Sequence, residues 1–185
     1  GQNLVIETGT LSVENAIIFD VLTEGTVTAD IATDSTLASL ATLTGTNEFT
    51  IVINSADAIT DALSLIAIEN TTSIDIDASE VIEITGESSA ITSLYNSPIF
   101  EGLGDENIVI SNGLDIEEAN YIDTLTTGVI TASISSTVDA SALIGLTGSN
   151  DYTYILPGGL PVTVGDLNQI SANISIDVDA SAITS

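Results

Sequence analysis

Two stretches of this sequence decide its fold, because they are copies of each other. The stretch Leu11–Ile31 reads LSVENAIIFDVLTEGTVTADI, and Leu114–Ile134 reads LDIEEANYIDTLTTGVITASI. The alignment continues without a gap from LATLTGTNEFTIVI at Leu40–Ile53 to LIGLTGSNDYTYIL at Leu143–Leu156, at an offset of 103 residues. Self-similarity at a fixed period is the signature of a repeat architecture. We therefore expect a repeat protein rather than a globular fold with a unique sequence for each element.

The long repeat sets the domain organisation. We predict a single repeat domain over residues 1–185, with a first long repeat at 1–104 and a second, incomplete one at 105–185. An additional loop with Pro98, Gly102 and Gly104 lies at the end of the first long repeat. The second copy of that loop would follow Ser185, so we expect this end of the chain to be open.

A shorter period lies inside the long repeat. Apolar, β-branched runs typical of strands recur about every 20–25 residues, and helix-like stretches with apolar residues three or four apart lie between them. The predicted strands are Leu4–Ile6, Val27–Ile31, Phe49–Ile53, Ile74–Ala78, Ile108–Ile110, Ile130–Ile134, Tyr152–Leu156 and Ile174–Val178. The predicted helices are Val13–Leu22, Ala56–Ala67, Ser88–Tyr95, Ile116–Leu125 and Val164–Ile170, with helical turns at Leu37–Leu43 and Ala140–Leu146.

One strand and one helix in each short period form the coil of a solenoid. We predict an α/β solenoid of about eight strand–helix coils, with all strands in one parallel sheet. The spacing resembles that of leucine-rich repeats, although the asparagine ladder of that family is missing from this pattern. The alternative is an all-β helix or solenoid in which the predicted helices are only turns.

Alternation along each strand predicts which side chains face the core. In the second strand Val27, Ala29 and Ile31 are expected inside, and in the fourth Ile74, Ile76 and Ala78. Phe49, Ile51 and Ile53 correspond to Tyr152, Tyr154 and Leu156 in the second copy. The tyrosine in place of Ile51 indicates that this layer reaches solvent or a hydrogen-bond partner for its hydroxyl.

The charge excludes several classes of function. The chain has 27 Asp and Glu residues and no Lys, Arg, His or Cys, which gives a formal net charge of −27. Nucleic-acid binding needs cations to neutralise phosphates, so we expect no nucleic-acid partner. No apolar run is long enough for a transmembrane helix, so we expect no membrane insertion. The composition provides neither a Ser–His dyad nor a thiol nucleophile.

Carboxylates are the best candidates for a site. Asp75 and Asp77 alternate on one strand and both point outward, and Asp177 and Asp179 repeat the pair. The predicted neighbours of the first pair are the Thr50–Val52 and Val109 strands, so we expect it to stand alone on a neutral sheet face. A second cluster is expected at Asp105, Glu106 and Asp115. Oxygen ligands without a basic partner suit Ca²⁺ or another divalent cation, although surface charges that only solubilise the chain fit the same pattern.

Paired carboxylates also occur in glycosidases, but we expect no enzyme here. A glycosidase needs two carboxyl groups at a set separation, usually in a cleft with stacking aromatic residues. Trp is absent, aromatic residues make up 4% of the chain, and the Asp pairs recur with the repeat as structural features do.

One motif carries a family resemblance. Val138–Gly148 reads VDASALIGLTG and Ile76–Gly86 reads IDASEVIEITG, and Gly102–Ile110 reads GLGDENIVI. These segments resemble repeat units and their links in very large repetitive surface or secreted proteins of bacteria, cyanobacteria among them. The resemblance implies an extracellular, structural or adhesive role and carries over no catalytic residue.

Two functions remain open on this basis. The first is a structural, non-enzymatic segment of an extracellular filament, surface layer or giant surface protein, with like copies or neighbouring repeats stacked end to end as its partners. The second is a Ca²⁺-dependent adhesin or binding module that uses the sheet face.

Overall fold

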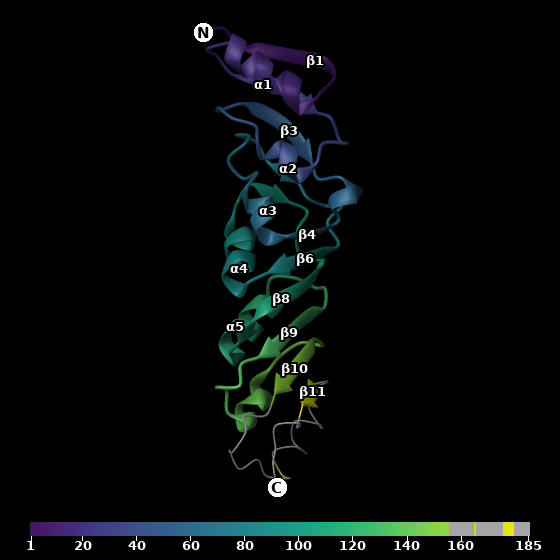
Figure 1. Cartoon of the computed structure of the whole chain (residues 1–185), viewed down its shortest axis with the longest axis vertical. Coiled ribbons are helices and arrows are strands. Elements are labelled where there is room, and N and C mark those ends of the chain that lie inside the picture. The colour runs from purple at the N-terminus through teal and green to yellow at the C-terminus, as the bar shows by residue number, and fades with distance from the viewer. Residues whose placement is uncertain (156–164, 166–175, 180–185) are drawn as a thin grey trace. The chain divides into compact units, whose positions relative to one another are not determined.

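The computed structural model describes residues 1–155, residue 165 and residues 176–179. It is a mixed α/β protein with parallel sheets (Figure 1). The chain divides into two compact units. The first unit contains Gly1–Ile84 and Ser93–Leu103, and the second contains Thr85–Thr92 and Gly104–Ser185.

Short strands alternate with short helices along the described chain. The strands are β1 Leu4–Leu11, β2 Val27–Ile31, β3 Glu48–Val52, β4 Ile59–Asp61, β5 Ile76–Asp77, β6 Glu83–Gly86, β7 Phe100–Glu101, β8 Asn107–Leu114, β9 Ile130–Ile134, β10 Asp151–Ile155 and β11 Ile176–Asp179. The helices are α1 Val13–Leu22, α2 Leu37–Leu40, α3 Ala62–Ile66, α4 Ser88–Asn96 and α5 Ile116–Asp123, with 3₁₀ turns η1 at Ser55–Asp57 and η2 at Ala140–Gly145.

The first unit is built on a five-stranded sheet in the order β1-β2-β3-β5-β7. Each neighbouring pair is parallel, and the register places Ala29 beside Phe49 and Ile51 beside Ile76. These inward side chains are almost fully buried. One apolar ladder therefore runs from strand to strand and forms the core, as the alternation predicts.

The second unit repeats this arrangement with the parallel strands β8, β9, β10 and β11. Ile108 lies beside Ile130, and Ala132 lies beside Tyr152. Helix α1 lies against β1 and β2 in the first unit, and α5 lies against β9 in the second (Figure 1). The helices thus stand at equivalent places in the two copies.

The prediction of an α/β protein with parallel strands is confirmed, but the prediction of one continuous sheet is wrong. The strands that the structure describes form two sheets. Strand β7, at the edge of the first sheet, has only two residues, Phe100 and Glu101. Gly102 follows with a φ of 83°, a conformation that side chains with a Cβ rarely adopt, and it turns the chain out of the strand.

The predicted helix Ala56–Ala67 is largely wrong. Only Ala62–Ile66 is α-helical, because the Asp61 side chain accepts a hydrogen bond from the Ser64 N–H and caps the helix there. The residues before it form η1 and β4, and the Ala58 carbonyl accepts hydrogen bonds from the N–H groups of Ile82 and Glu83. A contact distant in sequence therefore overrides the helical spacing.

The predicted burial of Ile74 is also wrong. Ile74 is 36% exposed, whereas Ile76 and Ala78 are fully buried as predicted. The strand begins only at Ile76, so Ile74 lies before the alternation starts. The predicted helix Val164–Ile170 lies outside the described residues except for residue 165. Leu156, the last residue of the predicted strand Tyr152–Leu156, also lies outside them.

Helix starts follow the capping signals of the sequence. Ser12 accepts from the Asn15 N–H and begins α1 at Val13, as predicted. Asp115 and Glu118 form a reciprocal capping box at the start of α5. Within the described part of the chain, no helix has the length and apolar character needed to cross a membrane.

Candidate functional site

The most elaborate polar arrangement in the first unit surrounds the buried Asn47. Its side chain is 1% exposed, and its Oδ1 accepts a hydrogen bond from the backbone N–H of Val27 at 2.8 Å. Its Nδ2 donates to Oδ1 of Asp20 at 2.7 Å and to the carbonyl of Thr44 at 3.0 Å. The Thr44 hydroxyl donates to the other oxygen of Asp20 at 3.2 Å. We call Asp20, Thr44 and Asn47 the first asparagine hub.

The second unit contains the same arrangement 103 residues later. Oδ1 of Asn150 accepts from the N–H of Ile130 at 2.9 Å, and its Nδ2 donates to Oδ1 of Asp123 at 2.7 Å. The Thr147 hydroxyl donates to the second oxygen of Asp123 at 2.9 Å. Asp123, Thr147 and Asn150 form the second asparagine hub.

A glycine is required beside each hub. Gly45 and Gly148 have φ values of 84° and 76°, which glycine adopts without steric cost. A Cβ at Gly45 would lie 2.6 Å from Oδ1 of Asp20, and a Cβ at Gly148 would lie 2.1 Å from Oδ1 of Asp123. The absence of a side chain therefore lets the aspartate approach the turn.

Each hub joins three successive parts of the chain. In the first, Asp20 is on α1, Val27 begins β2, and Asn47 directly precedes β3. The aspartate carboxylate receives neutral amide and hydroxyl donors in place of the Lys or Arg that the sequence lacks. The chemistry of this site is structural: it satisfies a buried backbone N–H and a carboxylate at the same time.

Threonine takes the equivalent place where asparagine is absent. The Thr72 hydroxyl, buried in the first unit, accepts from the N–H of Phe49 at 3.0 Å and donates to the Phe49 carbonyl at 2.8 Å. In the second unit Thr126 makes a different set of bonds: its hydroxyl donates to the Glu106 carbonyl at 2.7 Å and accepts from the N–H of Gly128 at 2.9 Å. Among the described residues, the buried asparagines are Asn47 and Asn150, one in each unit, so they form no ladder from coil to coil. The repeated Thr-Gly-x-Asn at 44–47 and 147–150 was the available signal.

The Asp75–Asp77 pair does not stand alone. Strand β7, which the sequence did not predict, lies beside β5 and places Glu101 next to Asp77 in register. The expectation of a neutral neighbourhood is therefore wrong on this side. Asp75 is exposed, and the hydroxyl and N–H of Ser79 hold the pKa of Asp77 below its usual value.

The other candidate ligands are placed separately. Asp177 and Asp179 lie on β11, in register with Thr153 and Ile155, and their side chains are outside the described part of the structure. Asp105 precedes β8, whereas Asp115 follows it and caps α5. The structure thus does not bring Asp115 to the loop cluster. Among the described residues, no group of three or more Asp and Glu side chains is arranged to hold a metal ion.

Among the predicted ligands whose side chains the structure describes, only Glu106 is buried, with 2% exposure. Its Oε2 accepts hydrogen bonds from the N–H groups of Gly104 at 2.8 Å and Asp105 at 3.2 Å. Its Oε1 is buried without a partner among the described residues. The side chain therefore folds back onto its own loop rather than outward beside Asp105, which is exposed.

The two tyrosines of β10 enter the core. Tyr154 is fully buried, and its hydroxyl donates to the Val138 carbonyl at 2.6 Å. The prediction that this layer offers the hydroxyl a partner is confirmed. Burial, with the charge of Asp123 adding to it, raises the pKa of Tyr152 to about 12. Burial likewise raises the pKa of Tyr154, with a smaller contribution from Asp139.

Comparison with protein-family models, with curated proteins and with solved structures found no match for this chain.

Proposed function

We propose that this chain is a structural, non-enzymatic segment of an extracellular filament, surface layer or giant surface protein, folded as an α/β solenoid. The observation that carries the proposal is the asparagine hub, built twice at an offset of 103 residues with the same donors and acceptors. A polar network that recurs with the long repeat is a structural feature of that repeat, since in each copy it ties the same helix to the same two strands.

The strand ladders support the same proposal. Within each unit, neighbouring strands are parallel and the inward residues form apolar layers. Stability then comes from contacts between nearest coils, and the hubs replace ion pairs. The chain has no Lys or Arg, so it offers trypsin-like proteases no cleavage site, which suits a durable extracellular material.

The partners we propose are like copies or neighbouring repeats stacked end to end. A strand at the end of a parallel sheet leaves its outer N–H and C=O groups unpaired and can accept a further strand. Contact between matched but different ends produces open, linear assemblies.

Electron microscopy of native material that contains this chain tests the proposal. Regular fibres, or a lattice with a period set by the repeat, are the expected result. Isolated particles that carry a bound ligand would contradict it. Sedimentation of the purified chain adds a second measurement, since a clean monomer at high concentration would count against self-assembly of this chain alone.

One observation favours the alternative of a Ca²⁺-dependent adhesin or binding module. Asp77 and Glu101 are register partners on neighbouring strands of the first sheet, and both alternate outward from the buried Ile76 and half-buried Phe100. Carboxylates side by side attract divalent cations. Calcium titration of the wild type against D77N/E101Q, with D75N as the matched control, separates the two functions: a specific site loses affinity only in the double variant.

A further inference from the structure

The first unit has an open apolar face at β1 and the end of α1. β1 is the outermost strand of its sheet, Val5 is 56% exposed, and Leu22 is 76% exposed. A cavity of about 440 Å³ lies there, and Gln2, Asn3, Leu4, Leu22 and Thr23 are among the residues that line it. Exposed apolar side chains beside a free strand edge are typical of a surface that another chain segment covers.

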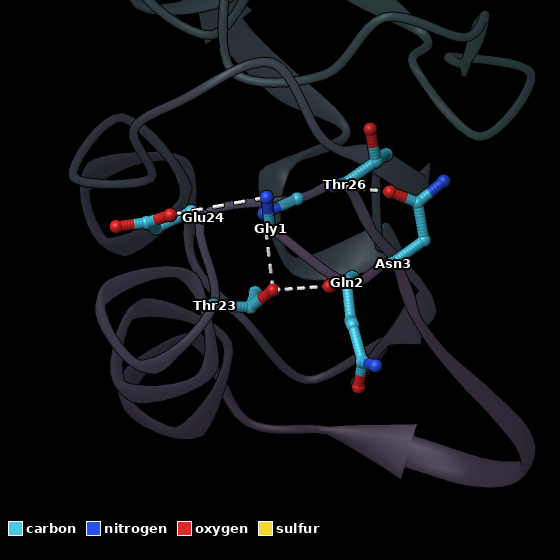
Figure 2. A network of polar contacts seen from close by, with 7 residues as sticks. Gly1, Gln2, Asn3, Thr23, Glu24 and Thr26 are labelled. Atoms are coloured by element: carbon cyan, nitrogen blue, oxygen red, sulfur yellow. Dashed lines mark hydrogen bonds and ion pairs between the residues drawn. The ribbon is translucent and has the colours of Figure 1, made fainter.

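This face is already organised in the structure. The Thr23 hydroxyl donates to the Gln2 carbonyl, and Oδ1 of Asn3 accepts from the N–H of Thr26 at 3.1 Å (Figure 2). The start of β1 is thereby tied to the loop after α1. A partner would meet a preformed surface and would not have to order it, which lowers the entropic cost of binding.

The second copy shows what happens at the equivalent positions. Ile108 and Ile110 are buried, whereas their counterparts Leu4 and Ile6 are only half-buried. Three further pairs show the same change towards burial in the second copy: Val5 with Val109, Leu22 with Leu125, and Thr23 with Thr126. We call Leu4, Val5, Ile6, Leu22 and Thr23 the N-terminal face.

In the second unit, Thr85–Thr92 lies over β8. The backbone N–H of Ser88 donates to Oδ1 of Asn112 at 2.8 Å, and Nδ2 of Asn112 donates to the Ser88 hydroxyl at 3.1 Å. Asn112 aligns with Gly9 of β1 at the offset of 103 residues, whereas the pairs at the start of the two strands, such as Leu4 and Ile108, are offset by 104. A Cβ at Gly9 would have nothing within 4 Å, so the corresponding place on β1 is empty space.

We infer that the N-terminal face is a docking surface for a second copy of the segment Ile84–Gly104, supplied by a neighbouring long repeat. The inference rests on the proposed function, and it identifies the chain segment that would cover the N-terminal face in an end-to-end stack. The segment suits the surface electrostatically, because it carries only the carboxylates of Glu87 and Glu101. A segment with so few charges avoids most of the repulsion that a typical stretch of this anionic chain would experience.

The test extends the full chain by a second copy of residues 84–104, placed directly before Gly1. This junction reproduces the native order, in which Gly104 precedes the next coil. We expect the melting temperature to rise by about 5 °C, the shift that one to two buried aliphatic side chains cause in a protein of this size. An extension with the same residues in scrambled order is the control and should give no rise.

Two substitutions place the docking site. Leu22→Glu should cancel the rise in the extended chain, because Leu22 aligns with Leu125, which is half-buried in the second copy. Val21→Glu is the matched control, since Val21 is 78% exposed and its counterpart Thr124 is also exposed. Both variants should leave the melting temperature of the unextended chain almost unchanged.

The inference is overturned if the native extension gives no rise, if the scrambled extension gives the same rise, or if V21E cancels it as fully as L22E. Circular dichroism of each extended chain verifies that it is folded. The outcome is independent of the microscopy: fibres without a stabilising extension would retain the proposed function and reject this docking surface.

Discussion

Replacing Asn47 with alanine tests the asparagine hub most directly. The substitution removes the acceptor of the Val27 N–H. Val27 is the first residue of β2 and is fully buried. It also removes the donor to the Asp20 carboxylate. An orphaned buried N–H costs about 1–3 kcal/mol, and a hydrogen bond to a charged group contributes about 1.5–3 kcal/mol.

The two losses do not add fully, because Asp20 is only half-buried and water can replace part of what it loses. We expect N47A to lower the free energy of unfolding by about 3 kcal/mol. In a protein of this size, this corresponds to a fall in melting temperature of about 6–12 °C.

The assay is thermal and urea denaturation followed by circular dichroism. Asn3→Ala is the control, because Asn3 is exposed and accepts a single hydrogen bond from Thr26 at 3.1 Å. It should cost well under 1 kcal/mol. Asn150→Ala should match N47A, since its hub has the same bonds. If N47A proves no more costly than N3A, the hub does not stabilise the contact of α1 with β2 and β3, and the reasoning fails.

Three further predictions follow from the described residues. Tyr152→Phe should reduce the loss of stability at alkaline pH. The pKa of Tyr152 is raised to about 12 in the folded protein, so its contribution to the free energy of unfolding is complete below pH 10. About 2–3 kcal/mol of that free energy is lost as the pH rises to 12. Phe49 is buried at the equivalent position of the first copy, which shows that a phenylalanine ring fits there. Equal alkaline unfolding curves for the wild type and Y152F would refute this prediction. Glu106→Gln should raise the melting temperature by about 2–4 °C, because it removes a buried charge yet keeps an acceptor for two N–H groups; a fall would show that the carboxylate is needed. Millimolar Ca²⁺ should raise the melting temperature beyond that of a NaCl control of equal ionic strength, since 27 carboxylates repel one another; identical curves would reject divalent stabilisation.

Much of the fold could be predicted because the repeat supplies each pattern twice. The strands Val27–Ile31 and Ile130–Ile134 have the predicted bounds. The alternation of apolar and polar residues depends only on neighbouring positions, and it determines which side chains of a strand face the core. The helices α1 and α5 begin where predicted because a capping side chain acts within its own turn.

Local patterns mislead where distant residues decide the local structure. The residues before α3 are not α-helical, because the Ala58 carbonyl accepts hydrogen bonds from the N–H groups of Ile82 and Glu83, more than twenty residues away. The spacing of apolar residues within the segment contains no information about such a bond. Strand β7 is not predictable from alternation, because two residues are too few to show it. Without β7, the proximity of Glu101 to Asp77 could not be foreseen either.

The sequence by itself determined the repeat, the α/β class, the apolar ladder and the absence of side-chain cations, because each of these depends on residue type and spacing alone. Only the tertiary structure decided which polar residues act together. Asp20 and Asn47 are separated by a strand and a helix, and they meet because β2 and β3 pair in parallel, which brings the start of β3 close to the end of α1. Likewise Asp105 and Asp115 are near in sequence but lie at opposite ends of β8, since an extended strand separates what a turn would bring together.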